Sequence, residues 1–187
     1  MSKMEIRLAG SGGQGVILAS VILAEAALIS GKHTAQSQSY GPEARGGACK
    51  AETMISDDPI GFTKVLHPDF LLALTETALK KYGKNAPENC RIMIDDSLSL
   101  PEGMDPEKIL RFPILRSAKE KVGRVQTANV VAVGCINSVL HLADEASIKR
   151  AVTMHVPPGT EEINLKALKV GIGLVGENQA EKEKEAV

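Results

Sequence analysis

The chain has 187 residues, of which 43% are hydrophobic, and a formal net charge of −1 from 22 basic and 23 acidic side chains. This length suits one domain with a core of ordinary size. The balanced charge gives no electrostatic reason to expect a nucleic acid or an anionic membrane as partner. The start of the chain lacks a signal-peptide pattern, and the uncharged run at residues 8–24 is too short and too rich in glycine and serine to span a bilayer. We therefore expect a cytoplasmic protein.

The first third of the chain predicts a strand, a glycine-rich loop, a helix and two further strands. Residues 4–9 alternate between apolar and polar side chains, and residues 16–30 have the composition of a helix that ends at Gly31. Residues 33–39 and 48–56 alternate as strands do, and the segment YGPEARGG between them predicts a loop.

The rest of the chain alternates short apolar runs with helical segments. The predicted strands are residues 70–74, 91–95 and 109–113. The predicted helices are residues 75–82, 118–122, 129–142, 146–154 and 161–175. This alternation indicates one α/β domain over residues 1–176, with a sheet covered by helices. The charged segment 177–187 predicts a disordered tail.

The loop GSGGQGV carries the spacing G-x-G-x-x-G at Gly10, Gly12 and Gly15. Backbone N–H groups at such a helix start can hold an anion against the positive end of the helix dipole. A nicotinamide or flavin enzyme would also need an acidic residue at the end of the second strand, but the first acid there is Glu43, beyond the strand. Three interpretations stay open: a tight turn that packs the helix close to the sheet, a site for another phosphate ligand, or a dinucleotide site.

The segment QSQSYGPEARGG, residues 36–47, is dense in hydrogen-bonding groups and poor in apolar ones. It can be a solvated loop. Alternatively, Gly46 and Gly47 let a partner backbone approach while the Arg45 guanidinium binds a carboxylate or phosphate with two hydrogen bonds. We favour the second interpretation, an interface or ligand role.

Residue types that carry chemistry on their own are scarce. Cys49, Cys90 and Cys135 are far apart in sequence and form no C-x-x-C pair, so we expect buried thiols and neither a disulfide framework, a zinc site nor an iron–sulfur site. The G-x-S-x-G, H-E-x-x-H and Walker patterns are missing as well. We therefore expect no catalytic residue and no metal on this chain, which indicates part of a larger enzyme.

Four segments together, GSGGQGV, QSQSYGPEARGG, HPDFLLALT and VPPGTEEINLKALKVG, resemble the gamma subunits of the 2-oxoacid:ferredoxin oxidoreductases. The likeness covers most of residues 4–173. The second segment is most similar to the 2-oxoglutarate (KorC-type) branch, with indolepyruvate and branched-chain members as alternatives. The resemblance implies an α/β fold, a three-layer sheet-and-helix domain like domain III of pyruvate:ferredoxin oxidoreductase.

The resemblance also implies a complex that decarboxylates a 2-oxoacid on thiamine diphosphate, passes electrons through iron–sulfur clusters to ferredoxin, and delivers the acyl group to coenzyme A. Thiamine diphosphate and the clusters would lie on partner chains, the alpha, beta and ferredoxin-like delta subunits. This chain itself has no G-D-G thiamine motif. We expect the isolated chain to be inactive and to be able to form a homodimer through apolar surface that partners normally cover.

The two loops are therefore our candidates for contact with a ligand or another subunit. Our hypothesis is that they support packing between subunits or offer amides to a phosphate of coenzyme A, and that they do not hold a nicotinamide. A stand-alone dinucleotide-dependent oxidoreductase and a scaffold subunit without a ligand remain as alternatives. The candidate residues are Gly10, Ser11, Gly12, Gly13, Gln14, Gly15, Gln38, Ser39, Tyr40, Gly41, Glu43, Arg45, Gly46 and Gly47.

Overall fold

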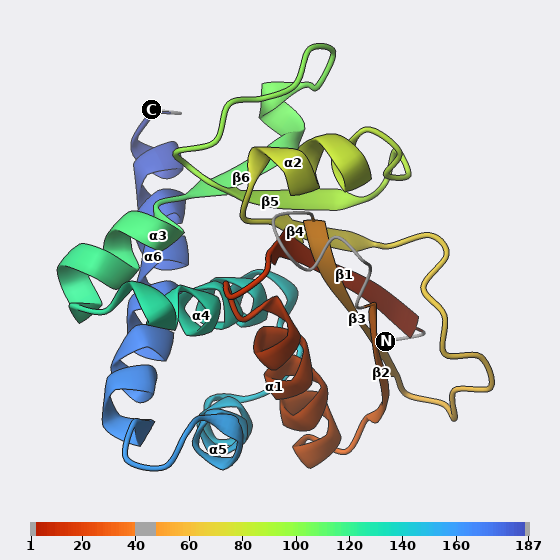
Figure 1. The fold of residues 1–187 in the computed structure, drawn as a ribbon, viewed down its shortest axis with the longest axis vertical. Coiled ribbons are helices and arrows are strands. Elements are labelled where there is room, and N and C mark those ends of the chain that lie inside the picture. Colours follow the sequence, from red (N-terminus) through yellow and green to blue (C-terminus); the bar gives the residue numbers. More distant parts are fainter. Residues whose placement is uncertain (1–2, 40–47, 186–187) are drawn as a thin grey trace.

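The computed structural model describes residues 3–39 and 48–185 of the chain. It contains a six-stranded sheet with strand order β2-β3-β1-β4-β5-β6, flanked by helices (Figure 1). The strands are β1 (Lys3–Ser11), β2 (His33–Ser39), β3 (Ala48–Ser56), β4 (Phe70–Ala73), β5 (Arg91–Asp95) and β6 (Ile109–Phe112). The helices are α1 (Val16–Ile29), α2 (Glu76–Ala78), α3 (Ile114–Ser117), α4 (Ala128–Leu140), α5 (Glu145–His155) and α6 (Glu161–Glu185). Two π-helical segments, Leu79–Gly83 and Ala118–Val122, continue α2 and α3.

The register of the sheet fixes where the strand ends lie. β1 pairs in parallel with β4 and antiparallel with β3, and β3 in turn pairs antiparallel with β2. β5 and β6 extend the parallel part of the sheet. β2 therefore runs in the same direction as β1. The carboxyl ends of β1, β2, β4, β5 and β6 share one edge of the sheet, which we call the carboxyl edge.

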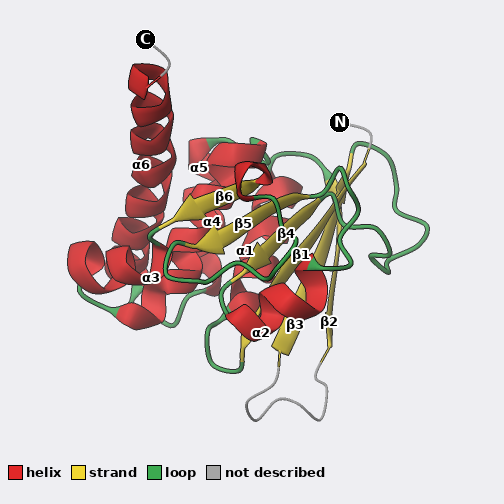
Figure 2. Cartoon of the chain, turned by 90° about the horizontal axis from the view of Figure 1, so that it is seen from above, coloured by secondary structure: helices red, strands yellow, loops and turns green. Residues whose placement is uncertain are grey.

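Helices cover both faces of the sheet. α2 lies on one face, and α1 and α4 lie on the other (Figure 2). The larger core joins Ile6 and Leu8 of β1 to α1, α4, α5 and α6, and a smaller core joins Ala9 and Leu71 to α2. The predicted three-layer α/β architecture is confirmed.

Most predicted elements agree with the structure, and β2 and β3 have the predicted bounds. The main difference is at the C-terminal end, where α6 continues to Glu185 although composition predicts disorder from residue 177. The physical reason is that Glu, Lys, Ala and Gln are good helix formers. An ion pair of 3.3 Å between Lys121 and Glu177 also links this part of α6 to the π-helical segment after α3.

The start of α5 gives a prediction about pH. Asp144 caps this helix by accepting a hydrogen bond of 2.8 Å from the Ser147 amide, and that bond holds the pKa of Asp144 below its usual value. A depressed folded-state pKa means that the cap stabilises the protein fully near neutral pH and loses its effect as the pH falls through the acidic range. Asp144→Ala should therefore lower the thermal midpoint near neutral pH, and the gap to the wild type should shrink in acid. Asp144→Asn keeps a capping oxygen, so its thermal midpoint should lie between those of the wild type and Asp144→Ala. A difference between wild type and Asp144→Ala that does not change with pH would contradict this assignment.

Candidate functional site

The glycine loop connects β1 to α1 at the carboxyl edge. Gly13 and Gly15 have φ values of 88° and 70°, which side chains other than glycine adopt only at a cost. Gly15 is the N-cap of α1 and, having no side chain, leaves the helix without a side-chain cap. The G-x-G-x-x-G spacing thus corresponds to a tight turn that directs the helix start toward the edge of the sheet.

Gln14 anchors this loop from the sheet side. Its Oε1 accepts a hydrogen bond of 2.7 Å from the Ser11 amide, and its Nε2 donates one of 3.3 Å to the Leu74 carbonyl at the end of β4. Because a Cβ on Gly10 would lie 2.6 Å from Gln14 Oε1, the glycine at position 10 makes room for the folded-back side chain.

Asn129 anchors the loop from the helix side. It is 4% exposed in the first turn of α4, and its Nδ2 donates a hydrogen bond of 3.3 Å to the Gly15 carbonyl. A Cβ on Gly15 would lie only 2.5 Å from that nitrogen. Gly15 therefore satisfies two requirements at once, a left-handed backbone and close contact with α4.

A hollow of about 430 Å³ lies against the glycine loop and the first turns of α1. One part of its wall is the loop backbone with the uncapped helix start, where peptide N–H groups favour a negative charge. The other part is apolar. We call this the glycine-loop hollow, and its lining residues are Ser11, Gly13, Gly15, Val16, Ile17, Leu18, Val21 and Cys49. It can take an anionic group attached to an apolar body, or an apolar side chain of a partner protein.

The second predicted loop starts and ends at the same edge. Ser11 pairs with Ala48, so the residue that follows the segment lies beside the start of the glycine loop. The exposed Ser39 pairs with Lys50, one strand farther out at the same edge. Of the candidates, Gln38 and Ser39 are described and exposed. The others, Tyr40, Gly41, Glu43, Arg45, Gly46 and Gly47, lie outside the described residues, and their roles stay predictions.

Sequence reasoning missed a charged network on the sheet face opposite α1. Glu52 is 5% exposed, and its Oε1 accepts hydrogen bonds from Arg7 Nε at 2.7 Å and from Lys50 Nζ at 2.9 Å. Arg7 also lies 5.7 Å from the ring centre of Tyr82. Two cations share one carboxylate here, so this trio carries a net positive charge. The only sequence signal was the polar side chains at alternate strand positions.

The three cysteines differ in environment. Cys90 and Cys135 are buried as predicted, and burial raises the pKa of the Cys90 thiol to about 11 and that of Cys135 still further above its usual range. Cys49 is only partly buried, because it faces the glycine-loop hollow, so the prediction of a buried thiol is wrong there. Residues 3–39 and 48–185 contain no group of three side chains able to hold a metal ion. Within the same ranges, none of the helices is long and apolar enough to cross a membrane.

Comparison with known proteins identifies the family to which this chain is similar. Residues 5–174 match the family model of pyruvate ferredoxin/flavodoxin oxidoreductase. The chain is 43% identical over 173 residues to the 2-oxoglutarate synthase subunit KorC of Methanocaldococcus jannaschii, covering 90% of this chain and 92% of that subunit. It is 41% identical, with a TM-score of 0.82, to the gamma subunit of a keto/oxoacid ferredoxin oxidoreductase from Geobacter sulfurreducens, covering 94% of this chain and 97% of the other.

A third likeness concerns the fold alone. The 2-oxoglutarate:ferredoxin oxidoreductase from Magnetococcus marinus, solved with 2-oxoglutarate, coenzyme A and succinyl-CoA bound, has a TM-score of 0.80 at 20% identity and matches over 32% of its own chain. The same architecture thus occurs both as a separate subunit and as part of a longer polypeptide.

The full-length matches to oxidoreductase subunits make this chain a subunit of a multi-subunit oxidoreductase complex. The chain belongs to the pyruvate ferredoxin/flavodoxin oxidoreductase family, in which it is a gamma subunit of a 2-oxoacid:ferredoxin oxidoreductase.

Proposed function

We propose that this gamma subunit serves a complex that oxidises 2-oxoglutarate. The observation that carries the proposal is the pattern of identities over most of the chain. Subunits named 2-oxoglutarate synthase KorC are 37–43% identical to this chain, against 29–32% for subunits of ketoisovalerate and pyruvate/ketoisovalerate oxidoreductases. In the proposed reaction the complex releases carbon dioxide from the 2-oxoacid, passes the electrons to ferredoxin and transfers the acyl group to coenzyme A.

In this proposal residues 1–176 form the gamma domain, and the complex works in the cytoplasm. The alpha, beta and ferredoxin-like delta subunits hold thiamine diphosphate and the iron–sulfur clusters. The gamma chain contributes a contact surface for coenzyme A and the other subunits, and it holds no redox centre.

Purification of the complex from its source, followed by assay with 2-oxoglutarate, pyruvate and ketoisovalerate, tests the substrate. We expect the highest kcat/KM with 2-oxoglutarate, and no turnover by the gamma chain alone. A preference for pyruvate or ketoisovalerate would overturn the substrate assignment, and turnover by the isolated chain would overturn the division of labour.

For the glycine loop we propose contact with a phosphate of coenzyme A. The support is chemical: the glycine-loop hollow combines an uncapped helix start, which favours an anion, with an apolar wall. A second role, packing against a neighbouring subunit, is favoured by the outer face of α1. Leu28 on this helix is 53% exposed, and Ile17, Leu18 and Val21 are half-buried, so the helix lacks the polar outer face of a solvated surface helix.

Gln14→Ala in the assembled complex separates these two roles. The substitution removes both hydrogen bonds that shape the loop, and we expect the KM for coenzyme A to rise about tenfold, the equivalent of about 1.4 kcal/mol, with the KM for the 2-oxoacid unchanged. Asn89→Ala is the control, because Asn89 is an exposed amide just before β5, at the edge of the sheet opposite the glycine loop. Weaker assembly with an unchanged KM for coenzyme A would favour the packing role instead.

A further inference from the structure

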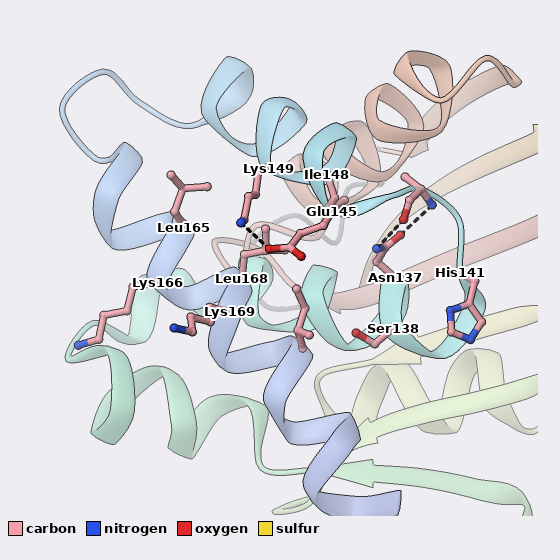
Figure 3. Close-up of a pocket in the computed structure, with 12 residues that line it drawn as sticks. Asn137, Ser138, His141, Glu145, Ile148, Lys149, Leu165, Lys166, Leu168 and Lys169 are labelled. Carbon is pink, nitrogen blue, oxygen red and sulfur yellow. Dashed lines mark hydrogen bonds and ion pairs between the residues drawn. The ribbon is translucent and has the colours of Figure 1, made fainter.

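A second surface lies away from the glycine loop. Asn129, which holds that loop, is in the first turn of α4, whereas a groove of about 880 Å³ opens at the other end of α4, between this helix, α5 and α6 (Figure 3). We call it the basic groove and define it by Ile148, Lys149, Leu165, Lys166, Leu168 and Lys169. No residue of the glycine loop lines it, so it is separate from the proposed contact with coenzyme A.

The floor of the basic groove is apolar. On α6, Leu165, Leu168 and Ile172 follow one another at intervals of three and four residues, which places them in one stripe along the helix. Ile148 of α5 joins them. Ile148 and Leu168 are 0% and 1% exposed, whereas Leu165 and Ile172 are only partly buried. The stripe therefore continues from the protein core out onto an open surface.

The rim of the groove carries three lysines from two helices. Lys149 comes from α5, and Lys166 and Lys169 come from α6 (Figure 3). Lys149 pairs with Glu145, but the two side chains are 52% and 72% exposed, so this pair contributes little and can exchange partners. Lys166 donates a hydrogen bond of 3.3 Å to the Val122 carbonyl, and Lys169 makes no ion pair within the part of the chain that the structure describes.

Glu145 shows how a carboxylate behaves at this rim. Its pKa is lowered by the hydrogen bond from Lys149 and by the charge of Lys149, and Lys169 acts in the same direction. Lysines from both walls thus stabilise one negative charge at the mouth of the groove. A carboxylate brought by another protein can take the place of Glu145 beside these lysines.

We propose that the basic groove binds an acidic amphipathic helix of another subunit of the same complex. Apolar side chains of that helix, spaced at i, i+3 or i+4 and i+7, lie on the floor stripe, and Asp or Glu side chains beside them pair with the rim lysines. Charge complementarity selects this occupant: the floor alone would accept any apolar segment, whereas three lysines from two walls reject a basic one. The proposal depends on membership in a multi-subunit complex and not on which 2-oxoacid is oxidised.

Charge reversal in the assembled complex tests the proposal. We expect Lys166→Glu combined with Lys169→Glu to raise the dissociation constant of the gamma subunit about tenfold or more, and to weaken its dependence on salt. The matched control is Lys80→Glu combined with Lys84→Glu, two exposed lysines outside the groove, which should leave assembly unchanged. Circular dichroism and thermal unfolding of both double variants establish that they fold. An unchanged dissociation constant for the groove variant would overturn the proposal.

Photo-cross-linking identifies the occupant directly. A photoreactive phenylalanine in place of Leu165, in the assembled complex, should join the gamma chain to an acidic helical peptide of another subunit. A cross-link to a second gamma chain or to a basic segment would overturn the proposal, as would a small anion found in the groove by native mass spectrometry with assembly unaffected by charge reversal. These results leave the coenzyme A contact of the glycine loop untouched, so the two proposals can fail separately.

Discussion

Gly171→Ala is expected to lower the free energy of unfolding by about 3 kcal/mol or more, the upper range for overpacking in a core. Gly171 lies where α6 crosses α4, and a Cβ there would be 2.0 Å from the Val131 carbonyl oxygen and 3.1 Å from the Cys135 nitrogen. Gly134 is its counterpart on α4, since a Cβ on it would lie 2.4 Å from the Leu168 carbonyl oxygen. Because the obstructing atoms are backbone, the two helices must separate to admit even one methyl group.

The matched control is on the same helix. Gly173→Ala introduces the same methyl group at an exposed position where a Cβ would meet nothing within 4 Å. We expect it to raise stability by up to about 1 kcal/mol, the helix-propensity difference between alanine and glycine. Urea unfolding of both variants gives the comparison. Equal losses at the two positions would show that helix propensity or general disturbance of α6, and not the helix crossing, sets the effect.

This crossing marks the limit of what sequence predicts about the fold. Alternation of apolar and polar residues is a local property, and it predicts β2 and β3 with their observed bounds and α1 to within a residue. A close approach of two helices is a property of two distant segments. Nothing in the residues around Gly134 says that α6 will pass over it, so the sequence predicts a buried helix there but not the need for glycine.

The candidate site likewise has features that the sequence predicts and features that it does not. The spacing of Gly10, Gly12 and Gly15 predicts a tight turn at a helix start, because that geometry is encoded within a few residues. Asn129 is 114 residues away from the Gly15 carbonyl that it binds, and it carries no local sign of that role. Cys49 was expected to be buried. It lies on β3 opposite Gly10 of the neighbouring β1, beside the glycine-loop hollow, and the sequence alone does not determine this register.

The glycine loop gives a prediction in which two causes can be separated. Gly13→Ala places a side chain at φ +88° in open space, so only backbone strain of about 1–2 kcal/mol is expected. Gly15→Ala adds to a similar strain a contact with Asn129 Nδ2 that would be 2.5 Å long, and it should be the more destabilising of the two. The measurement is the free energy of unfolding of both variants.

Asn129→Ala completes a double-mutant cycle with Gly15→Ala. Alone, it removes the hydrogen bond to the Gly15 carbonyl and should cost about 1 kcal/mol. Combined with Gly15→Ala, it removes Asn129 Nδ2 and Cγ, the two atoms that would lie closest to the new methyl group, and leaves only Cβ at 3.2 Å. The double variant should therefore be more stable than the sum of the two single losses predicts. Strict additivity would mean that Asn129 moves aside freely. In that case Asn129 would not fix the position of the loop, and Gln14 alone would hold the amides beside the glycine-loop hollow.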